Sequence, residues 1–221
     1  MTAQPAVQAF TTDADFFARA AARLSLHLPA NADAAALLRG DHAPDVPASR
    51  PDFIRAARPA AVLIGIVERA EGARVILTRR AAHLREHSGQ VAFPGGKIDA
   101  RDASPLAAAL REAQEEIGLD LRHAEPIGYL DPYLTGTGFR VIPVLARVSP
   151  HFSAAADARE VEAVFETPLA FLMAPDNHRR ETREWKGAMR HYYVMPWQEH
   201  KIWGATAGMI RALHARLYGG G

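Results

Sequence analysis

The hydrophobic positions along this chain follow two different spacings, which predicts a mixture of helices and strands. Apolar residues recur every three or four positions in three stretches, 12–24, 105–117 and 202–218, as in amphipathic helices. Runs rich in β-branched and aromatic residues predict strands at 61–67, 73–78, 91–93, 126–130, 139–148, 161–165 and 190–196. A short helix is also expected near 168–173. Because strands and helices interleave without a regular βαβ period, we predict an α/β fold with a mixed sheet between helices.

Turn-forming and capping residues sharpen several of these boundaries. Glu68–Gly72 separates two strand runs and predicts a hairpin. Pro143 has no backbone N–H, so we expect the strand at 139–148 to be an edge strand or a bulged one. Ser104 is a favourable N-cap for the helix at 105–117.

The chain divides by composition into an N-terminal part and a core. Residues 1–58 combine the first helix with a proline-rich stretch, in which we expect one short helix at 34–39. We interpret this part as a helix and an extended arm that pack on a single core domain at 59–218. The glycines at 219–221 are interpreted as a tail.

Charge and cysteine content exclude several classes of function. The chain has 26 basic and 25 acidic side chains, and a net charge of +1 gives no basis for bulk attraction to nucleic acid or membranes. The absence of cysteine excludes a disulfide scaffold, a thiolate zinc site and a cysteine nucleophile. The first ten residues show neither a basic segment nor a long apolar run, so we expect a cytoplasmic protein.

The most informative segment is an acidic helix face. Glu112, Glu115 and Glu116 fall on one side of the helix at 105–117, and its apolar residues fall on the other. Like charges at this spacing repel each other by about 0.2–0.5 kcal/mol per pair on an isolated helix. A hard divalent cation such as Mg²⁺ or Mn²⁺ relieves that repulsion, because it takes oxygen ligands. The alternative interpretation is an acidic face exposed to solvent.

A basic stretch precedes this helix in the chain. It contains one acid, Glu86, among five basic residues, which are Arg79, Arg80, His83, Arg85 and His87. Arginines hold phosphate oxygens through paired hydrogen bonds, so such a stretch suits a polyanionic substrate. The alternative is a basic loop exposed to solvent.

Residues 95–118 resemble the signature of the Nudix hydrolases, in which a glycine and a long spacer precede R-E-x-x-E-E-x-G. The resemblance implies the α/β/α sandwich of that family and a bound Mg²⁺ or Mn²⁺. It also implies four metal ligands, namely Glu112, Glu115, Glu116 and the backbone carbonyl of Gly96. Arg111 would orient the carboxylates through a salt bridge. The spacer departs from the common pattern, because Asp102 stands at a glutamate position and one extra residue precedes Arg111.

Residues 76–96 resemble the additional motif of the Nudix enzymes that cleave coenzyme A, L-L-T-x-R-[SA]-x3-R-x3-G-x3-F-P-G-G, with Ile76 in place of the first leucine. The extra residue before Arg111 and the aspartate at position 102 also resemble the usual form of the signature in this subfamily. The resemblance implies hydrolysis of coenzyme A or an acyl derivative to 4′-phosphopantetheine and adenosine 3′,5′-bisphosphate. The expected substrate contacts are Arg80, Arg85, Gly95 and Phe139. Tyr133 is an alternative to Phe139 for stacking on the adenine.

Three questions stay open from the sequence. The general base is expected at Glu115 or at Glu160, with Glu162 or Glu166 as substitutes. The alternatives to coenzyme A cleavage are a Nudix hydrolase acting on a compound such as ADP-ribose, and a Nudix-fold binding module without catalysis. A homodimer is plausible because Nudix enzymes often pair, although no interface can be identified from the sequence.

Overall fold

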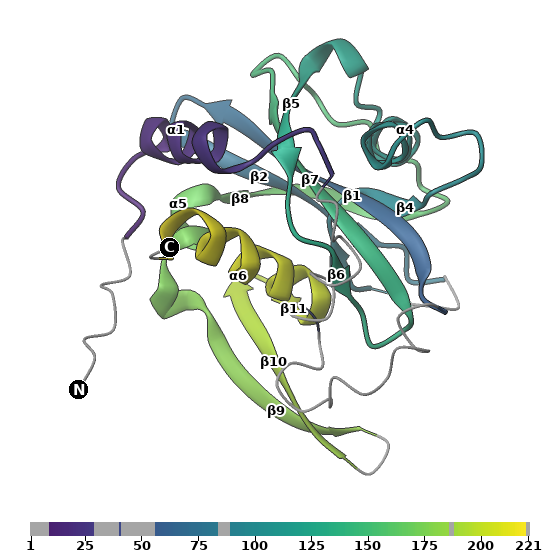
Figure 1. Ribbon diagram of the computed structural model, residues 1–221, viewed down its shortest axis with the longest axis vertical. Helices are drawn as coiled ribbons and strands as arrows, with labels where there is room; N and C mark the ends of the chain where they lie inside the picture. Colours follow the sequence, from purple (N-terminus) through teal and green to yellow (C-terminus); the bar gives the residue numbers. More distant parts are fainter. Residues whose placement is uncertain (1–8, 29–39, 41–55, 84–88, 186–187, 220–221) are drawn as a thin grey trace.

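The computed structural model describes residues 9–28, 40, 56–83, 89–185 and 188–219 (Figure 1). The short helix expected at 34–39 and the side chain of Arg85 lie outside the described residues. The structure is an α/β fold in which a large mixed sheet lies between helices, as predicted. No helix in the described ranges has the length and apolar character required to span a bilayer.

The helices in the described ranges are α1 (Asp13–Arg23), α4 (Pro105–Ile117), α5 (Leu169–Met173) and α6 (Gly204–Tyr218), together with the 3₁₀ turns η1 (Leu121–His123) and η2 (Pro175–Asn177). The main sheet contains β1 (Arg58–Arg69), β2 (Gly72–Arg80), β3 (Val91–Ala92), β4 (Gly95–Lys97), β5 (Ala124–Tyr129), β6 (Tyr133–Leu134), β7 (Phe139–Val148) and β8 (Val161–Pro168). A smaller sheet contains β9 (Arg179–Trp185), β10 (Ala188–Trp197) and β11 (His200–Trp203).

The main sheet is mixed because one central pair of strands is parallel. Its strand order is β3-β2-β1-β7-β5, with β4 on β1, β6 on β7 and β8 on β2. β7 runs parallel to β1 along its whole length, from Phe139 opposite Arg58 to Val148 opposite Val67, whereas the other pairs are antiparallel. The smaller sheet has the order β11-β10-β9.

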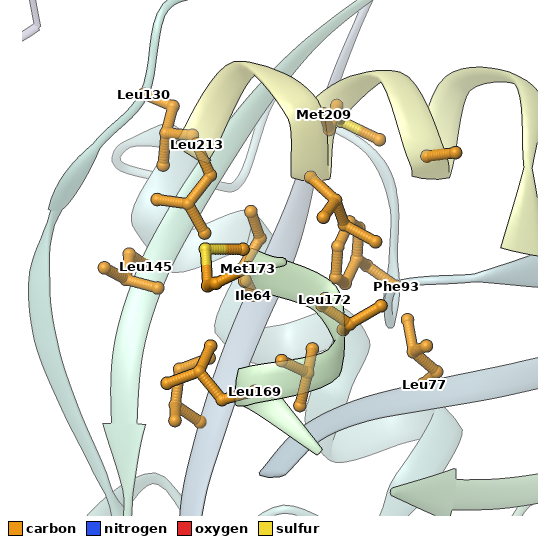
Figure 2. Packing of buried hydrophobic residues seen from close by; sticks show 14 of the residues in the cluster. Ile64, Leu77, Phe93, Leu130, Leu145, Leu169, Leu172, Met173, Met209 and Leu213 are labelled. Atoms are coloured by element: carbon orange, nitrogen blue, oxygen red, sulfur yellow. The ribbon is translucent and has the colours of Figure 1, made fainter. Parts of the chain in front are cut away.

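Alternate residues of the central strands face two hydrophobic cores, one on each side of the main sheet. Along β1, Ala61 and Leu63 pack toward α4, whereas Ile64 and Ile66 pack toward the other helices. Figure 2 shows the second core, in which sheet residues such as Ile64 meet side chains of α5 and α6. The predicted α/β/α arrangement is therefore confirmed.

α4 has clear ends, and both follow from its sequence. The hydroxyl of Ser104 accepts a hydrogen bond from the amide of Ala107 at 3.1 Å, as expected of an N-cap. Gly118 ends the helix with φ of 68°, a conformation that glycine adopts readily. Ala109, Ala113 and Ile117 are fully buried on the sheet. α4 is thus fixed in position and rotation, which determines where its glutamates lie.

The expectation that Pro143 marks an edge or bulged strand was wrong about the edge. β7 lies inside the sheet, between β1 and the pair β5 and β6. Pro143 falls where the neighbour of β7 changes, because β6 pairs up to Val141 and β5 begins at Val144. Between these two partners, the carbonyl of Pro143 accepts from the amide of Leu130 at 3.0 Å, so the proline is tolerated without being at an edge.

The last helix begins later than predicted. Ile202 and Trp203 belong to β11, where they pair with Met195 and Val194, and the helix begins at Gly204. β4, β6, β9 and β11 were not predicted. β9 has no apolar alternation, since its sequence is R-R-E-T-R-E-W, and it forms by pairing along its whole length with β10.

Candidate functional site

Two glycines of β4 allow the carboxylates of α4 to approach the main sheet. Gly95 has φ of 154°, and a Cβ there would lie against the carbonyl oxygen of Ala61 and 2.6 Å from the Cα of Val62. A Cβ on Gly96 would lie 2.6 Å from the carboxylate of Glu112. Glycine is therefore required at position 95 by the backbone, whereas at position 96 it leaves room for the carboxylate of Glu112.

Glu116 is the most deeply buried acid of the site. Its side chain is 4% exposed, its Oε2 accepts a hydrogen bond from the amide of Gly95 at 3.1 Å, and its Oε1 lies 3.7 Å from Nη1 of Arg80. Burial raises the pKa of Glu116 to about 7; the Gly95 amide and Arg80 oppose this shift, while Glu112 and Glu160 add to it. A second positive charge beside this group would stabilise its ionised form.

Arg111 holds the other two glutamates of the helix. Its Nη1 donates to Oε1 of Glu112 at 2.9 Å and to Oε2 of Glu115 at 3.1 Å. The pKa of Glu112 is raised by burial, against the influence of Arg111. Glu115 is more open to solvent, with a side chain that is 54% exposed and that also lies 3.7 Å from Arg101. The salt bridge proposed for Arg111 is therefore present in the structure.

Asp102 anchors Arg111 from the opposite side, a role that the sequence did not suggest. Nε and Nη2 of Arg111 each donate to one carboxylate oxygen of Asp102 at 3.0 Å. The amide of Asp99 donates to the same carboxylate at 2.8 Å. Arg111 is the main reason why the pKa of Asp102 is lowered to about 2. The unusual spacer before Arg111 thus supplies a fixed support for that arginine.

Glu160 approaches the same carboxylates from the loop before β8. Its negative charge is one of the causes that raise the pKa of Glu112 and of Glu116, after burial. Its backbone carbonyl accepts from the amide of Ala81 at 2.9 Å, just after β2. The amide of Asp157 in the same loop donates to the backbone carbonyl of Glu116 at 3.0 Å. The loop is therefore attached both to the end of β2 and to the end of α4.

The basic stretch contributes unequally to this site. Arg80 ends β2 and reaches Glu116, whereas its neighbour Arg79 pairs with Glu162 at 3.2 Å. Nε2 of His83 is 3.1 Å from the carbonyl oxygen of Arg159. Of the predicted phosphate contacts, Arg80 lies at the carboxylate cluster and Arg85 lies outside the described residues.

The aromatic residues proposed to stack on the adenine lie in different environments. Phe139 is half-buried at the start of β7, and the guanidinium carbon of Arg58 lies 4.0 Å from the centre of its ring. Tyr133 is 6% exposed and belongs to the core, where its hydroxyl contacts Gly208 of α6. Arg58 covers one face of Phe139, and the stacking role of that ring remains a prediction.

The chemistry of the cluster fits a hard divalent cation. Within the described ranges, no three carboxylate or imidazole groups converge closely enough to hold an ion as they stand. Arg111 and Arg80 instead pair with the oxygens of Glu112 and Glu116. Both acids have pKa values raised by burial and by neighbouring negative charge, which is an electrostatic imbalance that a cation corrects. All the candidate donors are oxygens, as Mg²⁺ and Mn²⁺ prefer.

Comparison with known proteins assigns the family. A model of the NUDIX domain matches residues 57–211. The chain is 45% identical over 179 residues to a Cronobacter sakazakii protein named "Uncharacterized Nudix hydrolase NudL", over 76% of this chain and 88% of that protein. The solved structure of the Nudix hydrolase RenU from M. smegmatis is similar, with a TM-score of 0.45 and 24% identity over 51% of this chain and 71% of that one. The chain therefore belongs to the Nudix hydrolase family.

Proposed function

We propose that this Nudix hydrolase cleaves the diphosphate bond of coenzyme A or an acyl derivative. The products are 4′-phosphopantetheine, or its acyl form, and adenosine 3′,5′-bisphosphate. The proposal rests chiefly on one observation, the contact of 3.7 Å between Arg80 and Glu116. Arg80 belongs to the motif at 76–96 that resembles coenzyme A-cleaving enzymes, and Glu116 belongs to the carboxylate cluster. The contact supports a substrate-binding role for Arg80 next to the candidate metal ligands.

Arg80 offers a hydrogen-bond donor, Nε, that is buried and has no acceptor among the described residues. A buried donor without an acceptor carries a desolvation penalty of about 1–3 kcal/mol, which a bound phosphate oxygen would remove. The guanidinium also offers several N–H groups in one plane, so it can contact a phosphate while remaining near Glu116.

The carboxylate cluster would hold the divalent cation. Glu112 and Glu116 would be the principal ligands, with Gly96 next to the carboxylate of Glu112 and with Glu115 at the more exposed side. When bound, Mg²⁺ or Mn²⁺ neutralises phosphate oxygens and lowers the pKa of a coordinated water. Arg111 and Asp102 keep the carboxylates oriented, through the contacts already described.

We assign the general base to Glu160. Arg111 and Arg101 both contact Glu115, whereas Glu160 shows no ion pair in the described contacts and its charge acts on both Glu112 and Glu116. In the reaction, the oxygen of water forms a bond to one phosphorus and its proton passes to Glu160. The bridging P–O bond breaks, and the leaving phosphate keeps the electron pair.

Replacing Arg80 with Ala should lower kcat/KM for coenzyme A by about 10- to 100-fold, because a hydrogen bond to a charged group is lost. Arg79→Ala is the matched control, because Arg79 is adjacent in the chain but pairs with Glu162. Initial rates measured over a range of coenzyme A concentrations test this difference. Equal losses of kcat/KM in the two variants would show that Arg80 does not contact the substrate.

Replacing Glu160 with Gln should lower kcat by roughly 100-fold or more, because the attacking water loses its proton acceptor. Binding of Mn²⁺, followed by its paramagnetic resonance signal, should change little. Glu162→Gln is the control, since Glu162 stands two positions away and pairs with Arg79. If Glu162→Gln loses as much activity as Glu160→Gln, the base has been assigned to the wrong residue.

Replacing Asp102 with Asn should weaken metal affinity or activity by about 10- to 100-fold through the loss of its paired contact with Arg111. Titration of the purified variant with Mn²⁺ measures the affinity directly. Saturating Mn²⁺ should recover part of the rate, because the metal ligands themselves are intact. Unchanged affinity together with an unchanged rate would show that Arg111 needs no support from Asp102.

The substrate is tested by comparing kcat/KM for coenzyme A, acetyl-coenzyme A, ADP-ribose and a dinucleoside polyphosphate under one set of conditions. We expect coenzyme A or its acyl form to be cleaved fastest. Much faster cleavage of ADP-ribose would identify a different Nudix activity. No turnover of any compound with either metal would favour a binding module.

A further inference from the structure

β9 is an end strand whose outer edge has no partner among the described residues. The smaller sheet has the order β11-β10-β9, so β9 pairs with β10 along one edge only. Figure 1 shows the long β9–β10 ribbon extending away from the main sheet. The side chains of Arg180, Thr182, Arg183 and Glu184 are exposed. An open strand edge of this kind is a template for pairing with another strand.

The pairing of β9 with β10 determines which residues face the open edge. Trp185 pairs with Ala188, and only two residues separate them in the chain. A connection of that length is closed by a hydrogen bond between the flanking residues, and bonded and non-bonded pairs then alternate along the ribbon. The backbone N–H and C=O groups of Arg180, Thr182 and Glu184 therefore point to the open edge.

The charges of β9 are complementary to themselves in one antiparallel register. A two-fold axis at Thr182 places Arg180 opposite Glu184 of a second copy, and Glu181 opposite Arg183 of that copy. Opposite charges in directly facing positions stabilise an antiparallel pair. With this axis, residues whose backbone N–H and C=O groups point to the open edge face each other across the interface. Hydrogen bonds between the two strands require that arrangement.

The other registers centred within this segment are unfavourable. Every residue from Arg180 to Glu184 except Thr182 is charged. A two-fold axis at one of these charged residues places it opposite the same residue of the second copy, so two like charges face each other. An axis at Glu181 also brings Arg179 opposite Arg183. Facing like charges destabilise a strand pair. The sequence of β9 therefore selects the Thr182 register.

We propose that β9 is the interface of a two-fold homodimer, in which it pairs antiparallel with β9 of a second copy about Thr182. The two three-stranded sheets become one continuous sheet. Glu181 is already oriented, because the Tyr192 hydroxyl and the Lys201 ammonium donate to its Oε2 at 3.0 and 3.2 Å. Charged residues on a sheet edge commonly prevent pairing, but here their order favours it in one register.

A single introduced thiol tests the register, because the chain contains no cysteine. Facing Cα atoms of a bonded antiparallel pair are about 5.5 Å apart, within the range that a disulfide spans. Thr182→Cys should therefore form a covalent dimer under mild oxidation. In Glu184→Cys the two thiols would stand roughly 13 Å apart along the strands, so this control should remain uncrosslinked. Thr182→Cys that stays monomeric, or Glu184→Cys that crosslinks equally fast, would overturn the proposal.

Charge reversal tests the same interface without a covalent bond. Sedimentation equilibrium of the full chain should show a dimer whose Kd rises by about tenfold or more in Arg180→Glu and in Glu184→Arg. The double variant, which exchanges the two charges, should regain the wild-type Kd to within about threefold. Arg122→Glu, an exposed reversal on η1, should leave the Kd unchanged. A wild type that is monomeric at every concentration, or a double variant as weak as either single one, would refute it.

Discussion

Replacing Glu116 with Gln is expected to lower kcat/KM by roughly 100-fold or more while the protein remains folded. The glutamine keeps an oxygen that can accept from the amide of Gly95 but removes the charge that a cation needs. It also removes a buried charge that Glu112 and Glu160 repel. We therefore expect the thermal unfolding midpoint of the metal-free variant to equal or exceed that of the wild type.

The control for this variant is Glu125→Gln, which makes the same chemical change at an exposed position on β5. Its turnover should match that of the wild type. Steady-state rates with Mg²⁺ and with Mn²⁺, together with thermal unfolding curves, separate loss of chemistry from loss of structure. Turnover close to wild type in Glu116→Gln would refute the metal assignment. Loss of activity together with loss of the folded state would instead show that Glu116 is a structural residue.

Alanine at Gly95 is expected to destabilise the fold by about 2–4 kcal/mol. The new Cβ would meet the backbone of Ala61 and Val62 on β1, which cannot move without disturbing the centre of the main sheet. The φ of 154° adds strain, because residues with side chains rarely adopt it. Urea unfolding should show a lower midpoint with an unchanged slope.

Gly96→Ala is the matched variant at the next position. The three atoms nearest to its Cβ would all belong to the carboxylate of Glu112, which lies at the end of a flexible side chain and can move. We expect the unfolding midpoint to stay close to wild type and kcat/KM to fall, since Glu112 leaves its position. If Gly96→Ala lowers the unfolding midpoint as much as Gly95→Ala does, a Cβ against the carboxylate is as destabilising as a Cβ against the backbone. That result would contradict our explanation. Full activity in Gly96→Ala would show that the observed position of Glu112 is not required.

The sequence predicted the part of the site that lies on one regular element. The spacing of Glu112, Glu115 and Glu116 and the cap at Ser104 are local properties of a helix, and α4 has the predicted bounds. The contact of Arg111 with Asp102 depends on how the spacer folds back on the helix. No periodicity encodes that path, so its residues could not be assigned in advance.

The errors in the predicted fold have the same cause, because local sequence patterns do not encode tertiary contacts. Pro143 indicates an edge in a regular sheet, but β7 changes neighbours at that residue, which only the complete topology reveals. β9 has no hydrophobic alternation, because it is exposed and is held by β10 alone within the described sheet. Ile202 and Trp203 have apolar side chains that suit a strand or a helix, and their pairing with β10 decides between them. Tertiary contacts determined each of these outcomes.

The central claim is that the carboxylates beside Gly95 and Gly96 serve the hydrolysis of the diphosphate in coenzyme A. Mass spectrometry of the products after incubating purified protein with coenzyme A and Mn²⁺ tests it most directly. The account predicts equal amounts of 4′-phosphopantetheine and adenosine 3′,5′-bisphosphate from the wild type, and neither product after chelation of the metal. Intact coenzyme A under conditions in which ADP-ribose is hydrolysed would contradict it.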